Sequence, residues 1–229
     1  MRARLVESRE LAPSVRHFVF EVPELKRFEF TPGQWVSFSA SLNGTEITRA
    51  YSIASEPTLS NRFELCLNEV GDGLLSPFLF ALAPGDSVDM RPPMGTFVLR
   101  EPPRDAVFIA TGTGVAPFRS MLRANLSRTC PQYVLLLGVR REAELLYSQE
   151  FEELGQRFPS FRFAPTLTRP AANWTGRQGR VQAHLEEIIA GRRDLEFYLC
   201  GLEAMVDDLR AILKGMGFDR KQIRYEKYD

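Results

Sequence analysis

A glycine-rich segment near the middle of the chain is the feature best suited to binding a phosphate. It follows the apolar run 106–110 and consists of Thr111, Gly112, Thr113, Gly114, Val115, Ala116 and Pro117. Glycines let a backbone approach a ligand, and the start of a following helix supplies free N–H groups and partial positive charge. Because Pro117 replaces the third glycine of a G-x-G-x-x-G motif, an ordinary tight turn remains the alternative.

A second candidate ends a predicted strand in the N-terminal half and consists of Arg49, Ala50, Tyr51 and Ser52. An arginine can hold a pyrophosphate bidentately, a tyrosine can cover a flat ring, and a serine can hydrogen-bond a ring nitrogen. We expect these three side chains to project to one face of the extended chain. An exposed arginine among ordinary strand residues is the alternative interpretation.

Two further segments carry weaker signals. One opens a short predicted helix and consists of Gly73, Leu74, Leu75 and Ser76. A hydroxyl near a helix N-terminus indicates either an anion site or a capped helix start. The other ends a predicted strand with Cys200 and Gly201, where a doubly wound sheet lines its ligand crevice. A core thiol is the alternative for Cys200.

The elements that position these residues differ between the two halves of the chain. In the first 100 residues, apolar and polar residues alternate in short runs at 15–21, 35–39 and 62–68. Turn residues separate the runs at 31–33, 42–45 and 84–86. Short strands and tight turns predict a small antiparallel β-barrel, with one helix at about 76–82.

After a proline pair at 102–103, strands and helices alternate. Continuous apolar runs at 106–110 and 134–137 predict strands buried on both faces. Further strands are expected at 161–167, 197–200 and 223–228, and helices at 115–124, 148–157, 181–190 and 205–216. This alternation predicts a parallel, nucleotide-binding sheet. We therefore expect two domains, a barrel at 1–100 and an α/β domain at 101–229.

Composition excludes several classes of protein. Lys+Arg and Asp+Glu both number 29, so the net charge of zero gives no indication of a nucleic-acid partner. The three cysteines are too few and too scattered for an iron–sulfur cluster, and His17 and His184 are too isolated for a metal site. Neither a signal peptide nor a membrane-inserting run is apparent, which predicts a cytoplasmic protein.

Together, these segments give the sequence its resemblance to a known family. Over essentially the whole chain it resembles the ferredoxin–NADP reductase family of flavoproteins. Residues 49–52 are similar to the family's R-x-Y-S flavin motif, and residues 73–76 to its G-x-x-S flavin-pyrophosphate motif. Residues 112–117 are similar to its nicotinamide-nucleotide loop, and residues 93–97 to the segment that closes the barrel.

The resemblance implies that the barrel binds FAD. Arg49 would hold the pyrophosphate, Tyr51 would pack on the ribityl chain and ring system, and Ser52 would hydrogen-bond flavin N5. The other residues implied at this site are Ala50, Gly73, Leu74, Leu75 and Ser76.

The resemblance also implies a nicotinamide-nucleotide site in the second domain. Its pyrophosphate would lie against Thr111, Gly112, Thr113 and Gly114, and Cys200 and Gly201 would lie beside the nicotinamide. Arg140 and Arg169 each follow a parallel strand, where the adenosine end should lie, and a guanidinium suits a 2′-phosphate. NADPH is therefore favoured over NADH. Tyr147 either stacks on the adenine or packs in the core.

The C-terminus departs from the pattern of the plant-type members, which end in Glu, one residue and a terminal Tyr stacked on the flavin. Glu226 and Tyr228 keep that spacing here, but Asp229 follows. By resemblance, Tyr228 would gate access of the nicotinamide, and Glu226 would offer a proton route. A solvated tail is the alternative.

The implied activity is that of a ferredoxin or flavodoxin–NADP(+) reductase. Hydride would pass from nicotinamide C4 to flavin N5, and single electrons would pass to ferredoxin or flavodoxin. The residues around the reacting atoms would be Ser52, Cys200, Glu226 and Tyr228. The alternatives are an NAD(P)H:flavin reductase, a reductase component of an oxygenase and, from another class, a non-catalytic flavin-binding electron-transfer subunit.

Overall fold

The computed structural model describes residues 1–228, and its residues group into two compact units. The first unit contains residues 1–99 and 116–124, and the second contains residues 100–115 and the described chain from residue 125 onward. Helix α2 (Ala116–Asn125) therefore groups mainly with the first unit, although it lies within the second half of the sequence. Phe118 of α2 packs against Phe97, with 5.9 Å between the ring centroids.

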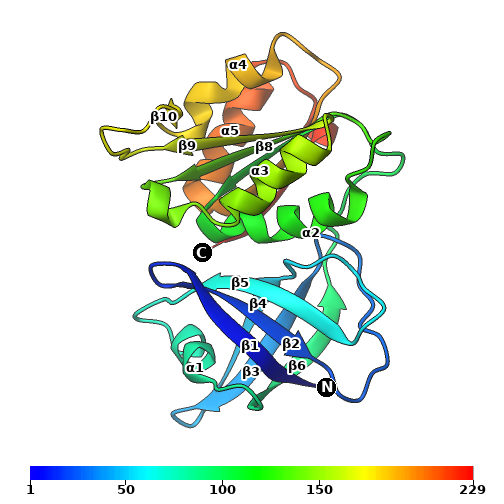
Figure 1. Ribbon diagram of the computed structural model, residues 1–229, viewed down its shortest axis with the longest axis vertical. Coiled ribbons are helices and arrows are strands. Elements are labelled where there is room, and N and C mark those ends of the chain that lie inside the picture. The colour runs from blue at the N-terminus through cyan, green and yellow to red at the C-terminus, as the bar shows by residue number, and fades with distance from the viewer. Residues whose placement is uncertain (229) are drawn as a thin grey trace. The chain divides into compact units, whose positions relative to one another are not determined.

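The first unit is an antiparallel sheet of six strands, in the order β4-β3-β6-β1-β2-β5 (Figure 1). The strands are β1 (Arg2–Ala12), β2 (Val15–Glu21), β3 (Trp35–Leu42), β4 (Thr45–Ser52), β5 (Arg62–Asn68) and β6 (Ser87–Met94). A bridge between Ile53 and Leu65 joins the end of β4 to β5, so the two outermost strands meet as a barrel requires. Helix α1 (Leu75–Ala81) lies between β5 and β6 in the chain.

Aromatic side chains fill the interior of the barrel. Phe20, Phe38 and Phe63 are buried and contact one another, with ring centroids 5.0–6.5 Å apart. In β2 and β5 every second residue points into this core, which explains why apolar and polar residues alternate in their sequences. Strands β1 and β6 were not predicted, because charged residues or prolines interrupt the alternation in both.

The second unit is a parallel sheet of six strands, in the order β10-β9-β8-β7-β11-β12. The strands are β7 (Ala106–Thr111), β8 (Tyr133–Val139), β9 (Phe161–Leu167), β10 (Arg177–Gln178), β11 (Glu196–Leu202) and β12 (Ile223–Tyr228). Strand β7 lies centrally between β8 and β11, and all of its residues except Thr111 are buried. The predicted two-part fold, an antiparallel β-barrel and a parallel α/β sheet, is confirmed.

Helices cover both faces of the parallel sheet (Figure 1). Helix α3 (Ser148–Arg157) packs through Phe151 against Phe161 and Phe163 of β9. Helices α4 (Leu185–Ile189) and α5 (Glu203–Gly215) share a core with Val107, Ile109 and Leu199, whose side chains point to the opposite face.

Two predicted helices begin differently in the structure. The segment predicted at 115–124 starts as a 3-10 turn, η1 (Gly112–Val115), before α2. The segment predicted at 181–190 divides into a 3-10 turn, η3 (Val181–His184), and α4, which ends at Ala190 in the left-handed conformation. The first turn of each segment is wound more tightly than an α-helix, a common feature of helix N-termini.

Candidate active site

The carboxyl ends of β7 and β11, together with η1, form the part of the second unit that we call the nucleotide edge. A Cβ on Gly114 would lie 2.4 Å from the carbonyl oxygen of Cys200, so no side chain fits there. A Cβ on Gly201, which has φ +138°, would lie 2.5 Å from Thr111 Oγ1. At these two glycines, therefore, η1 and the ends of β7 and β11 pack too closely for a side chain.

Thr111 has a buried hydroxyl at the nucleotide edge. Within residues 1–228, its Oγ1 makes no hydrogen bond and is inaccessible to solvent. Buried polar atoms in proteins are usually paired, so an unpaired one beside a glycine loop suits a site completed by a polar ligand. The sequence prediction of a phosphate loop at Gly112 and Gly114 therefore fits the local geometry, and Gly112 has the left-handed φ of +52°.

Cys200, Glu226 and Tyr228 come together at the same edge. Strands β11 and β12 pair in parallel register, with Cys200 opposite Glu226 and Leu202 opposite Tyr228. The Cys200 side chain is fully buried. Burial and the Glu226 carboxylate raise the pKa of the Cys200 thiol, and a hydrogen bond with Tyr228 acts in the opposite direction. The thiol is thus neutral, which suits a packing role better than a nucleophilic one. Asp229 lies outside the described residues.

Arg140 and Arg169 lie next to each other beyond β8 and β9. The Arg169 N–H donates to the Arg140 carbonyl at 2.7 Å, and both side chains are exposed. Neither guanidinium forms an ion pair with another described residue, so both can pair with an added anion. Tyr147 is buried, with its ring edge-on to that of Phe151, and this favours the core interpretation over adenine stacking.

Strand β4 carries the second candidate site, which we call the flavin edge. Arg49 is exposed and its Nη1 donates to the neighbouring Thr48 carbonyl, 2.8 Å away. Tyr51 is half-buried against Phe38, and burial raises its pKa to about 12. Because β4 extends through Ser52, Arg49 and Tyr51 share one face while Ser52 is buried on the other. The expectation that all three share one face is therefore wrong.

The segment 73–76 also belongs to this unit. Ser76 is the second residue of α1, and its hydroxyl accepts a hydrogen bond from the Val70 N–H at 2.9 Å. No side chain caps the start of α1, so the alternative of a capped helix start is wrong. The serine instead closes the turn 70–76 through this hydrogen bond, and Gly73 and Leu74 lie within the turn.

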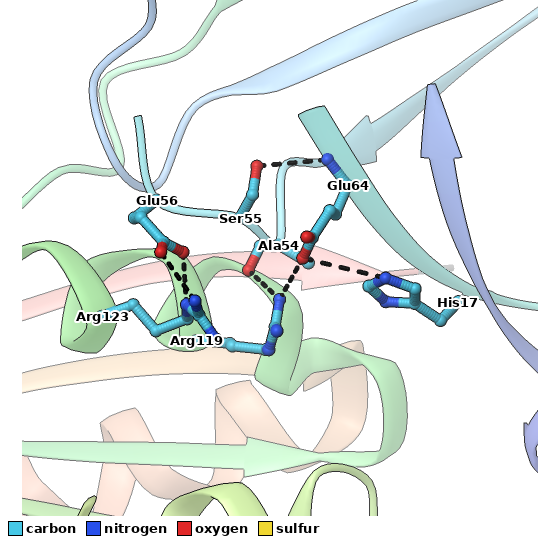
Figure 2. Close-up of polar contacts among 7 residues, drawn as sticks. All are labelled: His17, Ala54, Ser55, Glu56, Glu64, Arg119 and Arg123. Atoms are coloured by element: carbon cyan, nitrogen blue, oxygen red, sulfur yellow. Dashed lines mark hydrogen bonds and ion pairs between the residues drawn. The ribbon is translucent and has the colours of Figure 1, made fainter. Parts of the chain in front are cut away.

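Sequence reasoning missed the polar cluster in the first unit that joins the buried side chains of Arg119 and His17 to the half-buried Glu64 (Figure 2). The available signal was Arg119 itself, a charged residue among the apolar residues of the predicted helix 115–124. Its partner Glu64 lies on β5, and His17, which pairs with Glu64, lies on β2; both are more than 50 positions from Arg119, and no local pattern connects them.

Comparisons with known proteins agree with this geometry. Residues 2–99 match the family model described as an oxidoreductase FAD-binding domain, and residues 108–211 match an oxidoreductase NAD-binding domain. The chain is 40% identical to ferredoxin–NADP reductase B of Sorangium cellulosum, over 99% of this chain and 97% of that protein. It is 30% identical to the toluate 1,2-dioxygenase electron transfer component of Pseudomonas putida, over 99% of this chain and 67% of that protein.

A solved structure shows the same fold. The ferredoxin NADP+ reductase from Neisseria gonorrhoeae, described with bound FAD and NADP, superimposes with a TM-score of 0.85. That match has 24% sequence identity and covers 99% of this chain and 98% of the other.

The fold and the two family matches define a two-domain oxidoreductase with an FAD-binding and an NAD-binding domain. The chain belongs to the ferredoxin–NADP reductase family. It is a homologue of both a ferredoxin–NADP reductase and a reductase component of an oxygenase, so its partners include an electron carrier. Within residues 1–228, no helix is long and apolar enough to cross a membrane.

Proposed function

We propose that this protein is a cytoplasmic reductase that passes electrons from NADPH, through bound FAD, to ferredoxin or flavodoxin. The observation that carries the proposal is the nucleotide edge, where the Thr111 hydroxyl, unpaired within residues 1–228, lies beside Gly201 and where Gly114 also leaves no room for a side chain. The 40% identity to a ferredoxin–NADP reductase over nearly the whole chain supports the choice of carrier. Its three free cysteines are compatible with a reducing compartment.

In this proposal the barrel domain, residues 1–100, binds FAD along the flavin edge. Strand β4 pairs with β3 along Thr45–Ser52 and meets β5 at the Ile53–Leu65 bridge beyond its end, so among the described residues no second strand pairs with the side of β4 that carries Arg49. Arg49 would pair with the pyrophosphate, since its guanidinium has no acidic partner among the described residues. Tyr51 would cover the ring system and Ser52 would supply a hydrogen bond at N5. The remaining contacts would come from Ala50, Gly73, Leu74, Leu75 and Ser76.

The domain of residues 101–229 would bind NADPH at the nucleotide edge. Thr111, Gly112, Thr113 and Gly114 would surround the pyrophosphate and the nicotinamide end, while Cys200 and Gly201 would support the nicotinamide. Arg140 and Arg169 would pair with the 2′-phosphate, which NADH lacks. A backbone hydrogen bond holds these two arginines next to each other, and two exposed guanidiniums suit a dianionic group.

When bound, the two cofactors supply the redox chemistry, a hydride transfer from the nicotinamide to the flavin followed by release of single electrons. The protein supplies alignment. Tyr228 would occupy the nicotinamide position until the nucleotide displaces it, which makes it a gate. Glu226, paired in register with Cys200, would provide a proton route to solvent.

The proposal is tested by carrier reduction. The purified protein is mixed with NADPH and either a ferredoxin or a flavodoxin, and reduction of the carrier is followed by its absorbance. We expect carrier-dependent NADPH oxidation, with a lower rate for NADH. No acceleration by either carrier would contradict the proposal.

A second candidate function is that of a reductase component of an oxygenase system. The 30% identity to the toluate 1,2-dioxygenase electron transfer component favours it. The same assay separates the two when an oxygenase component is added as a third acceptor, because an oxygenase reductase would transfer electrons to its oxygenase partner faster than to a ferredoxin or flavodoxin.

A further inference from the structure

Helix α2 contributes a buried arginine to the barrel unit (Figure 2). Arg119 is 4% exposed. Its Nη1 donates to the Ala54 carbonyl at 2.9 Å and to Glu64 Oε2 at 2.6 Å. One nitrogen thus joins α2 both to the backbone that follows β4 and to a carboxylate on β5.

The acceptors of Arg119 are themselves tied together. The Ala54 N–H donates to the Glu64 carbonyl at 2.8 Å, and the Glu64 N–H donates to Ser55 Oγ at 3.1 Å. His17 Nε2 lies 3.8 Å from Glu64 Oε2 on the other side. Arg119 therefore stabilises the junction at which Ile53 bridges Leu65 and the end of β4 meets β5.

The two segments that Arg119 joins are each continuous in the chain with a segment that carries the proposed chemistry. Ala54 is two residues beyond Ser52, and α2 begins at Ala116, the residue after η1. The hydrogen bonds of Arg119 thus fix the position of α2 against the barrel strands and the path of the backbone after Ser52. An apolar side chain could fill the same space without the desolvation of a charge, so the specific hydrogen bonds are what the arginine adds.

The ion pair one turn further along α2 provides a contrast, because its arginine is more exposed than Arg119 while the two carboxylates are equally exposed. Arg123 pairs with both carboxylate oxygens of Glu56, and their side chains are 33% and 29% exposed. This pair also anchors α2 to the barrel unit, through a carboxylate that lies after Ser55 in the chain. Exposed pairs of this kind contribute little free energy.

We infer that Arg119 is a positioning residue for hydride transfer, because it holds the backbone beyond Ser52 and the start of α2 in one fixed arrangement. The inference rests on the proposed function, since it assumes that Ser52 faces the flavin and that η1 binds the nucleotide. The step it affects is the passage of a hydride from NADPH, which is oxidised, to FAD, which is reduced. Small displacements of reacting groups slow such steps by about one to two orders of magnitude.

Arg119→Gln and the matched control Arg123→Gln test the inference. Anaerobic stopped-flow mixing with NADPH measures the limiting rate of flavin reduction and the apparent Kd of NADPH. For Arg119→Gln we expect the limiting rate to fall by about tenfold or more. Its Kd, FAD content and reduction by dithionite should remain close to those of the unmodified protein. Arg123→Gln should change the rate by less than about twofold.

Several outcomes overturn the inference. One is an Arg119→Gln variant that folds, retains FAD and is reduced at the unmodified rate. If that variant does not fold, the double variant Arg119→Met/Glu64→Gln removes both charges and still lacks the bond to Ala54. A full rate in this double variant also overturns the inference. Failure of NADPH to reduce the unmodified protein would refute the proposed function instead, so the two failures are distinguishable.

Discussion

The nucleotide edge of the parallel sheet is built from backbone, whereas the flavin edge of the barrel is built from side chains. At the nucleotide edge, Gly114 and Gly201 leave no room for a Cβ, and the buried hydroxyl of Thr111 is unpaired within residues 1–228. At the flavin edge, Arg49 is exposed and Tyr51 half-buried on an outer strand. At the nucleotide edge, substitution of either glycine by a larger residue should thus abolish binding. At the flavin edge, removal of one side chain should weaken binding only by the contribution of that side chain.

The largest effect is expected from Gly114→Ala, which would sharpen this contrast. The new Cβ would meet the Cys200 carbonyl at 2.4 Å, so the backbone of one strand end must move. We expect kcat/KM for NADPH to fall by more than about 100-fold, with FAD retained. Gly71→Ala on the barrel is the matched control, because nothing lies within 4 Å of its Cβ position. An active Gly114→Ala variant would break the contrast.

The next largest effect is expected on the stability of the barrel unit at acidic pH, because His17 is buried in that unit. Burial lowers the pKa of His17 from 6.5 to about 4, against the opposing effect of the Glu64 carboxylate. Between these values the unfolded chain binds the additional proton, so stability rises with pH across this window. It falls as pH drops from about 6.5 towards 4, by up to about 3 kcal/mol. Urea unfolding at a series of pH values measures this dependence, and a His17→Phe variant should lose most of it. An unchanged dependence would show that other groups cause it.

Arg49→Ala tests whether the flavin edge depends on single side chains. Loss of a charge-assisted contact to the pyrophosphate should weaken FAD binding by about 10- to 100-fold. FAD retention after gel filtration and a fluorescence titration measure the effect. The exposed Arg91 on β6, which β3 separates from β4, provides the control, and Arg91→Ala should bind FAD normally. Equal losses in both variants would point to general electrostatics.

Arg140→Ala/Arg169→Ala should have a smaller and selective effect, because these two side chains add specificity to an edge otherwise built from backbone. We expect KM for NADPH to rise by about tenfold while KM for NADH stays unchanged. Steady-state kinetics with both nucleotides measure the effect. A parallel rise for NADH would argue against pairing with a 2′-phosphate.

The smallest effect is expected from Lys227→Gln on β12. Lys227 Nζ lies 2.8 Å from both Glu203 Oε1 and Asp207 Oδ2 on α5, which anchors the strand that ends in Tyr228. These pairs raise the pKa of Lys227 and are exposed. KM for NADPH should change by less than about threefold, and the difference should shrink at high salt. A larger effect that persists in salt would indicate a direct role in binding.

Local patterns in the sequence predicted the strands and helices whose periodicity is regular. Five elements have the predicted bounds, because the spacing of their apolar residues is regular: β2, β5, β9, β12 and α3. Strands β1 and β6 were missed because charged residues or prolines interrupt their alternation. Their strand conformation is fixed by pairing with distant segments, such as Arg2 with Asp89.

The candidate site shows the same limit. The glycine loop and the C-terminal residues could be found because their spacing is local, and the register of β11 with β12 then brings Cys200 to Glu226. The tie of Arg119 to Glu64 could not be found, because it joins residues 55 positions apart through the tertiary fold. The opposite orientation of Ser52 follows from the extent of β4, which the sequence did not determine.

The central claim, that a bound flavin accepts electrons from NADPH, is tested most directly by a visible spectrum. The purified protein is desalted and its spectrum recorded before and after NADPH is added without oxygen. We predict a retained yellow flavin band that bleaches rapidly. A colourless protein that oxidises NADPH only when free flavin is supplied would contradict the claim and identify a flavin reductase.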